Sequence, residues 1–105
     1  DPHELAMRRY VITDLLDDLT DSTDRLEQHV IMASLFEQLG GLLLVSNHRW
    51  IGAGKYLPRR LRAWDPERTD QLAAPFLAGD VAGALAIAQR ELDAAGGRVQ
   101  AGFTR

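Results

Sequence analysis

The sequence predicts an all-α fold, a small antiparallel bundle of four to five helices. Apolar residues recur at helical spacing along most of the chain, and no segment shows the two-residue alternation with β-branched residues that is typical of strands. Acidic residues suited to cap helices precede several of these segments. At 105 residues the chain can form one hydrophobic core, so we expect a single domain over 1–97 and a loose tail over 98–105.

The first predicted helix begins at Asp1 and Pro2, which provide an acidic N-cap and a proline at the first helical position. Apolar residues at helical spacing continue to about residue 20, opposite a charged face, which indicates an amphipathic helix. The segment 20–24, Thr-Asp-Ser-Thr-Asp, breaks this pattern and offers N-caps for the next helix.

The second predicted helix, over about 24–45, has a wide apolar surface and becomes apolar all round near its end, which is typical of a central helix. Gly40 and Gly41 interrupt it, each costing roughly 1 kcal/mol relative to alanine. We expect the pair either to kink the helix or to let another helix approach closely. His29 is expected to be a packed, hydrogen-bonded histidine at the edge of the core.

Two helices are predicted in the last third of the bundle. Asp65 and Pro66 repeat the start signal of the first helix, and this helix should run to about residue 78. Gly79 ends it, and Asp80 caps a final helix that extends to the glycines at 96–97.

The composition restricts which classes of function are possible. The net charge of -3 and pI near 5.5 disfavour a globally basic nucleic-acid binder, and the absence of cysteine excludes disulfides and thiolate metal sites. No apolar run approaches the roughly 20 residues of a membrane span, and no signal peptide is recognisable, so a soluble, cytoplasmic chain is expected. Eleven arginines against one lysine are typical of GC-rich bacterial genomes. The chain starts without methionine, as expected of part of a longer polypeptide.

The stretch Arg-Trp-Ile-Gly-Ala-Gly-Lys-Tyr-Leu-Pro-Arg-Arg-Leu, over 49–61, combines basic residues with glycines. We predict a loop over 46–54 and then a short helix over 55–62, with Pro58 in its first turn. The candidate phosphate-binding residues are Lys55, Arg59, Arg60, Gly52, Gly54 and Arg49. Between residues 28 and 64 the only acid is Glu37, so the cations are separated from the acidic first quarter of the chain.

Two interpretations of this stretch remain open. Glycines let a backbone approach an anion, the N–H groups of a helix start attract phosphate, and Lys and Arg side chains add charge. However, Gly52 and Gly54 lie too close together for a Walker A loop, and no strand precedes them. The alternative is a tight interhelical turn in which Trp50, Tyr56, Leu57 and Leu61 pack into the core. The pattern alone favours the turn.

No other set of residues predicts catalysis or metal binding. The aspartates between 14 and 24 lack the calcium-loop pattern. Carboxylates at this spacing usually lie together on an exposed face of a helix. The three histidines, His3, His29 and His48, are not at zinc-ligand spacing, and Ser46 has no evident base.

The motif Trp50-Ile51-Gly52-Ala53-Gly54-Lys55-Tyr56-Leu57, following a long helix, resembles the C-terminal helical region of bacterial nucleotidyltransferase-domain proteins. The similarity covers roughly residues 8–64. The resemblance implies a separate N-terminal catalytic domain, with a Gly-Ser loop and an Asp-x-Asp pair that hold Mg²⁺ and a nucleoside triphosphate. Neither motif occurs in this chain, which would act as the substrate-binding or accessory domain. It also implies that Lys55 contacts nucleotide phosphates, and that Arg59 and Arg60 line the same side.

The sequence supports a different class of function as an alternative. A free-standing helical protein–protein interaction module, dimeric through Gly40, Gly41 and the apolar end of the second helix, needs no nucleotide. A DNA-binding role for the short basic helix is weaker, because the net charge opposes it.

Overall fold

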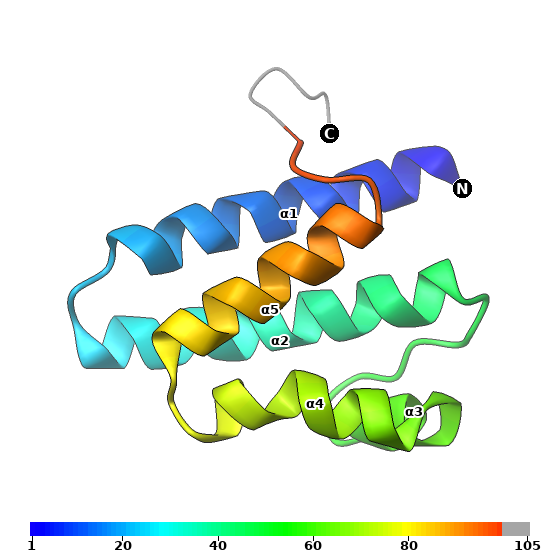
Figure 1. Ribbon diagram of the computed structural model, residues 1–105. Helices are drawn as coiled ribbons and strands as arrows, with labels where there is room; N and C mark the ends of the chain where they lie inside the picture. The colour runs from blue at the N-terminus through cyan, green and yellow to red at the C-terminus, as the bar shows by residue number, and fades with distance from the viewer. Residues whose placement is uncertain (100–105) are drawn as a thin grey trace.

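The computed structural model describes residues 1–99, in which five α-helices and no strand are present (Figure 1). The helices are α1 (Pro2–Asp21), α2 (Arg25–Ser46), α3 (Tyr56–Trp64), α4 (Pro66–Leu77) and α5 (Val81–Ala94). The antiparallel pair α1 and α2 forms one layer, α5 packs against both, and α3 and α4 lie along the other side of α2. The predicted all-α bundle is therefore confirmed.

Aspartate caps fix where four of the five helices begin. The side chains of Asp1, Asp24, Asp65 and Asp80 each accept a hydrogen bond of 2.9–3.0 Å from a backbone N–H in the first turn of α1, α2, α4 and α5. These bonds satisfy N–H groups that have no partner within the helix. The fifth helix, α3, differs because Lys55 occupies its N-cap position and makes no such bond.

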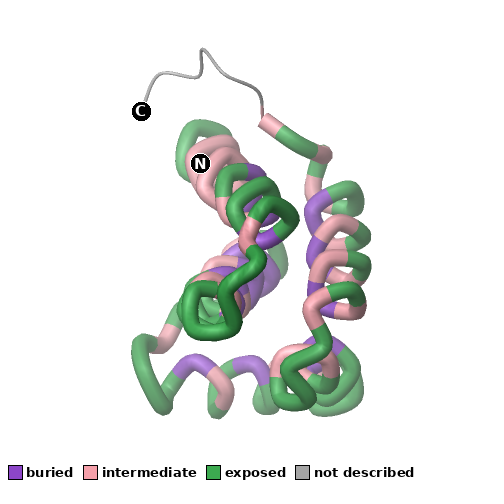
Figure 2. Tube along the Cα trace, turned by 90° about the vertical axis from the view of Figure 1, so that its left-hand side faces the viewer, coloured by how far each residue is buried: buried purple, intermediate pink, exposed green. Residues whose placement is uncertain are grey.

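The core has two parts. The main cluster joins α1, α2, α4 and α5, and its fully buried leucine and isoleucine side chains include Ile12, Leu19, Leu35, Leu39 and Leu92. A smaller cluster of Leu44, Leu57 and Leu61 holds α3 against the C-terminal half of α2. Figure 2 shows buried residues on the inward sides of the helices and exposed residues outside.

The two central glycines let neighbours approach α2, which continues through them as a helix. A Cβ atom on Gly40 would lie 3.1 Å from a methyl carbon of Leu57 and equally close to one of Leu61. A Cβ atom on Gly41 would lie 2.8 Å from Nη1 of Arg8. Of the two predicted roles for the pair, close approach is the one observed.

Among the described residues, α2 is the one helix long and apolar enough to cross a membrane, by length and composition alone. The core helix of a soluble protein has the same properties. In this fold Leu35, Leu39 and Leu42 of α2 are buried against the other helices, as in such a core helix.

The chain continues past α5 along the surface of α1. Arg98 hydrogen-bonds to Asp17 and to Gln89, and the backbone N–H of Val99 donates to Oγ1 of Thr13 at 3.1 Å. The first two residues of the predicted loose tail are thus held on the bundle. The remainder of that prediction, 100–105, lies outside the described residues.

Candidate functional site

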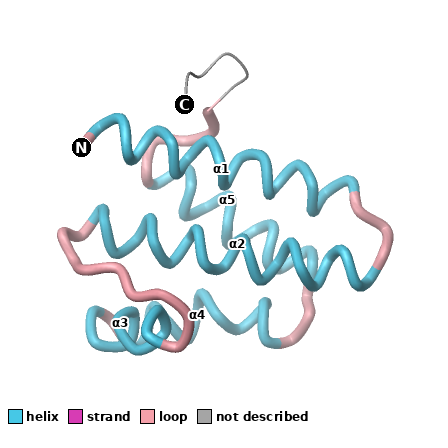
Figure 3. The backbone as a smooth tube through the Cα atoms, turned by 180° about the vertical axis from the view of Figure 1, so that it is seen from behind, coloured by secondary structure: helices cyan, strands magenta, loops and turns pink. Residues whose placement is uncertain are grey.

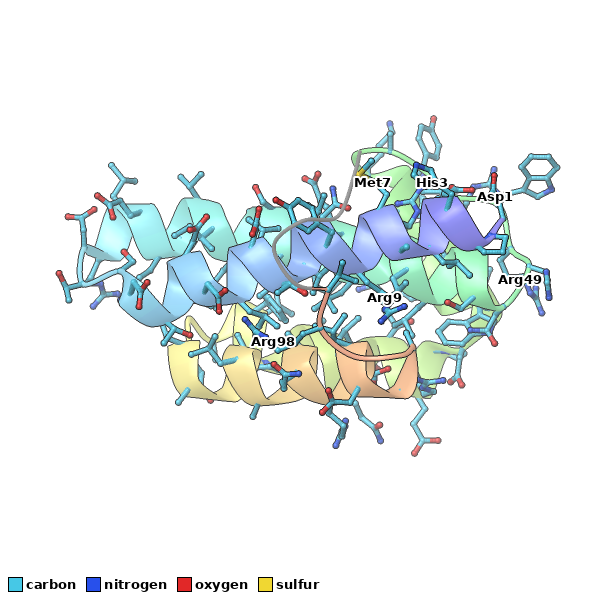
Figure 4. All side chains as sticks on the ribbon, turned by 90° about the horizontal axis from the view of Figure 1, so that it is seen from above. Asp1, His3, Met7, Arg9, Arg49 and Arg98 are labelled. Carbon is cyan, nitrogen blue, oxygen red and sulfur yellow. The ribbon has the colours of Figure 1, made fainter. Side chains whose placement is uncertain are left out.

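The loop over 47–55 carries the predicted basic motif. It leaves the C-terminal end of α2 and runs back along that helix to the start of α3 (Figure 3). The N–H of Arg49 donates to the carbonyl of Leu44 at 2.7 Å, and the Arg49 side chain points outward at this end of the bundle (Figure 4). Arg49 and Lys55 therefore lie at opposite ends of the loop, and the structure does not bring Arg49 into the group formed around α3.

Both glycines of the motif have roles within the loop. Gly54 has a φ of +55°, in the left-handed region that favours glycine. A Cβ atom on Gly52 would lie 2.7 Å from the backbone carbon and oxygen of Tyr56, so only glycine lets the loop lie against the first turn of α3. The predicted tight turn accounts for these two residues without a bound anion.

The N-terminus of α3 offers few free backbone donors. The N–H of Tyr56 donates to the carbonyl of Ala53, and that of Leu57 donates to the carbonyl of Gly54, both at 3.1 Å. Pro58 follows and has no N–H. The N–H groups of Tyr56 and Leu57 are therefore not free to bind a phosphate, because the loop itself uses them.

Two cations at the start of α3 lie close to one exposed aromatic ring. Nζ of Lys55 and Cζ of Arg59 each lie 5.5 Å from the ring centroid of Tyr56, within the range of cation–π contacts. At 100° per residue, Arg60 flanks Tyr56 on its other side, and Arg62 lies on the same side of the helix as Lys55 but about two turns further along. We call this surface, made of Lys55, Tyr56, Arg59, Arg60 and Arg62, the basic face of α3.

No residue of the basic face makes an ion pair within the part of the chain that the structure describes. The ion pairs of the described residues use three other arginines, in Arg8–Glu4, Arg68–Glu91 and Arg98–Asp17. Lys55, Arg59 and Arg60 are exposed and make no ion pair within residues 1–99. Their charge is thus available to an anionic ligand.

The aromatic residues of the motif lie differently from the prediction. Leu57 and Leu61 are buried, as expected of the turn. Trp50, however, is 83% exposed and Tyr56 is 52% exposed, so the expectation that both pack into the core is wrong. The loop runs over the outside of α2, and the smaller leucines close the core beneath it.

A groove that the sequence did not predict lies between the N-terminal half of α2, the start of α3 and the end of α4. Its volume is about 610 Å³. Its apolar lining includes Met32, Phe36, Leu57, Phe76, Leu77 and Val81. The rings of Phe36 and Phe76 meet edge to face, with centroids 5.4 Å apart.

Polar residues of α2 line the same groove: Arg25, Gln28, His29 and Glu37. His29 is exposed here, so the prediction of a packed histidine is wrong. Two apolar side chains of α2 also lie in water: Leu26 and Val30, one turn apart, are 71% and 57% exposed. Both residues lie outside the apolar stripe of α2 that packs into the core.

No group of three metal-ligating side chains comes together within the described residues. Asp17 of the acidic segment pairs with Arg98, and Asp24 caps α2. Comparison of the chain with protein-family models, with curated proteins and with solved structures returned no match.

Proposed function

We propose that this chain is the helical accessory domain of a nucleotidyltransferase-like protein, and that the basic face of α3 contacts nucleotide phosphates. The observation that carries the proposal is the group of cations around Tyr56, which is exposed and unpaired within the described residues. The resemblance of the Trp50–Leu57 motif to the helical region of such proteins supplies the ligand class.

The contact would be made by side chains. Lys55 supplies a compact charge, whereas Arg59 and Arg60 supply planar guanidinium groups that can donate two parallel hydrogen bonds to phosphate oxygens. Gly52 and Gly54 shape the loop that places Lys55, and Arg49 at the far end of the loop is not part of the contact. Mg²⁺ and the nucleoside triphosphate would be held mainly by an N-terminal catalytic domain of the same cytoplasmic, bacterial polypeptide. This chain would contribute no catalytic residue.

Titration of the chain with a nucleoside triphosphate and Mg²⁺ tests the phosphate contact. Lys55→Ala and Arg59→Ala should each weaken binding by about threefold, the effect of losing one exposed charge. Arg90→Ala is the matched control, because Arg90 is an exposed arginine on α5. Unchanged affinity in both α3 variants would overturn the phosphate role, as would loss of the fold in Lys55→Ala.

The coding region upstream of Asp1 tests the wider assignment. A strand–turn–helix unit that carries Gly-Ser and then Asp-x-Asp would support the nucleotidyltransferase context. An initiation codon directly before Asp1 would remove it and would leave the interaction module as the leading function.

The contact that the sequence suggested for that interaction module lies inside the folded chain. Gly40 and Gly41 are buried within one chain, and the leucines at 42–44 are at most 8% exposed. A second chain has no access to them in the folded bundle. The apolar surface that is accessible lies in the other half of α2.

A further inference from the structure

One wall of the groove is a regular row of residues on α2. Arg25, His29, Ala33 and Glu37 occur at every fourth position, all line the groove and all are exposed. Residues at this spacing form a continuous ridge along a helix, and such ridges fit into the grooves of a second helix. We call these four residues the α2 ridge.

The α2 ridge carries opposite charges at its ends. Arg25 and Glu37 are twelve residues apart, which corresponds to roughly 18 Å along the helix axis. Neither makes an ion pair within residues 1–99. If the same ridge of a second copy packed antiparallel to this one, Glu37 of the copy would lie near Arg25. Arg25 of the copy would then lie near Glu37 at the other end. The ridge is therefore complementary to itself.

Ala33, next to the midpoint of the α2 ridge, allows close approach, because it has the smallest side chain of the four. Apolar side chains that are left in water surround it: Leu26 and Val30 on α2, and Leu77 at the end of α4, which is 85% exposed. Leu77 also lines the groove. A helix crossing between His29 and Ala33 would cover this apolar surface, and burial of apolar surface is the main driving force of association.

We propose that this surface binds a second copy of the chain, forming a two-fold symmetric dimer in which the two α2 helices cross antiparallel between His29 and Ala33. The interdigitation of ridges at four-residue spacing gives a crossing angle with a magnitude of about 50°. In such an isologous contact each charge pair occurs twice. The dimer does not depend on the nucleotide role of α3.

Sedimentation equilibrium over a range of protein concentrations tests the dimer. The mass should rise from 11.7 kDa towards twice that value with concentration. Arg25→Glu and Glu37→Arg should each raise the dimer dissociation constant by at least about tenfold, because each places like charges together at both ends of the contact. The double variant Arg25→Glu/Glu37→Arg restores opposite charges and should return the dissociation constant to near its original value.

Matched controls separate the contact from a general effect of charge. Arg90→Glu and Asp18→Arg make the same charge changes at exposed positions on α5 and α1 and should leave the dissociation constant unchanged. Helical circular dichroism confirms that each variant is folded. A mass of one chain at every concentration overturns the proposal. So does a double variant that dimerises no better than the two single variants.

Discussion

Arg9 donates a hydrogen bond from Nε to the carbonyl oxygen of Gly97, at 2.9 Å, across 88 residues of sequence. Its Nη2 donates to the carbonyl of Gly96 at 2.8 Å. Figure 4 shows Arg9 on α1 beside the segment that follows α5. Both glycines have positive φ, and a Cβ atom on Gly96 would lie only 2.9 Å from Cζ of Arg9. One guanidinium group thus joins the first helix to the end of the last.

Arg9→Ala should lower the free energy of unfolding by about 2 kcal/mol, because it leaves two carbonyl groups without a charged donor. The lost cation also lies near the C-terminus of α5, where positive charge is favourable. Urea denaturation of Arg9→Ala and of Arg90→Ala measures the difference. Equal stability of the two variants would mean that Arg9 does not hold the chain end.

Gly52→Ala should lower the free energy of unfolding by about 1–3 kcal/mol, the usual cost of a forced steric overlap. The added Cβ would meet backbone atoms of Tyr56 at 2.7 Å, and backbone cannot rotate away as the tip of a flexible side chain can. Ala53→Ser, at the exposed neighbouring position, is the control and should be close to neutral. Thermal unfolding of both variants is the measurement. If Gly52→Ala were as stable as the control, the loop would not be packed as described.

The fold was largely predictable because its signals are local. An aspartate before each of four helices, proline after two of these caps, and leucines at helical spacing all act within one or two turns. The predicted helix limits consequently lie within about three residues of those observed.

The exposure of individual side chains was less predictable, because it depends on which helices pack together. A leucine at position 57 and a tyrosine at 56 are both apolar enough for a core, but α2 covers only one side of α3. The groove needs α2, α3 and α4 together, so no single segment indicates it. The contact from Arg9 to Gly97 joins the two ends of the sequence, and local spacing carries no information about it.

Asp65→Ala should lower the free energy of unfolding by about 1 kcal/mol, the typical loss for an N-cap. The Asp65 carboxylate accepts from the N–H of Arg68 at 3.0 Å and starts α4. Lys55→Ala, at the N-cap position of α3, should leave stability nearly unchanged because Lys55 makes no capping bond. Urea denaturation of the pair compares the two caps directly. A large loss in Lys55→Ala would show that Lys55 is structural and would count against its phosphate role.

Arg49→Ala should leave nucleotide affinity unchanged, whereas Arg59→Ala should weaken it by about threefold. The reason is position: Arg59 lies over Tyr56 on the basic face, and Arg49 lies at the opposite end of the loop. The affinity of the unmodified chain should also fall as salt is raised from about 0.05 M to about 0.5 M, because exposed charges are screened at that ionic strength. Calorimetric titration at both salt concentrations measures both effects. Equal losses in the two variants would point to a diffuse electrostatic attraction and would exclude a defined phosphate contact on α3.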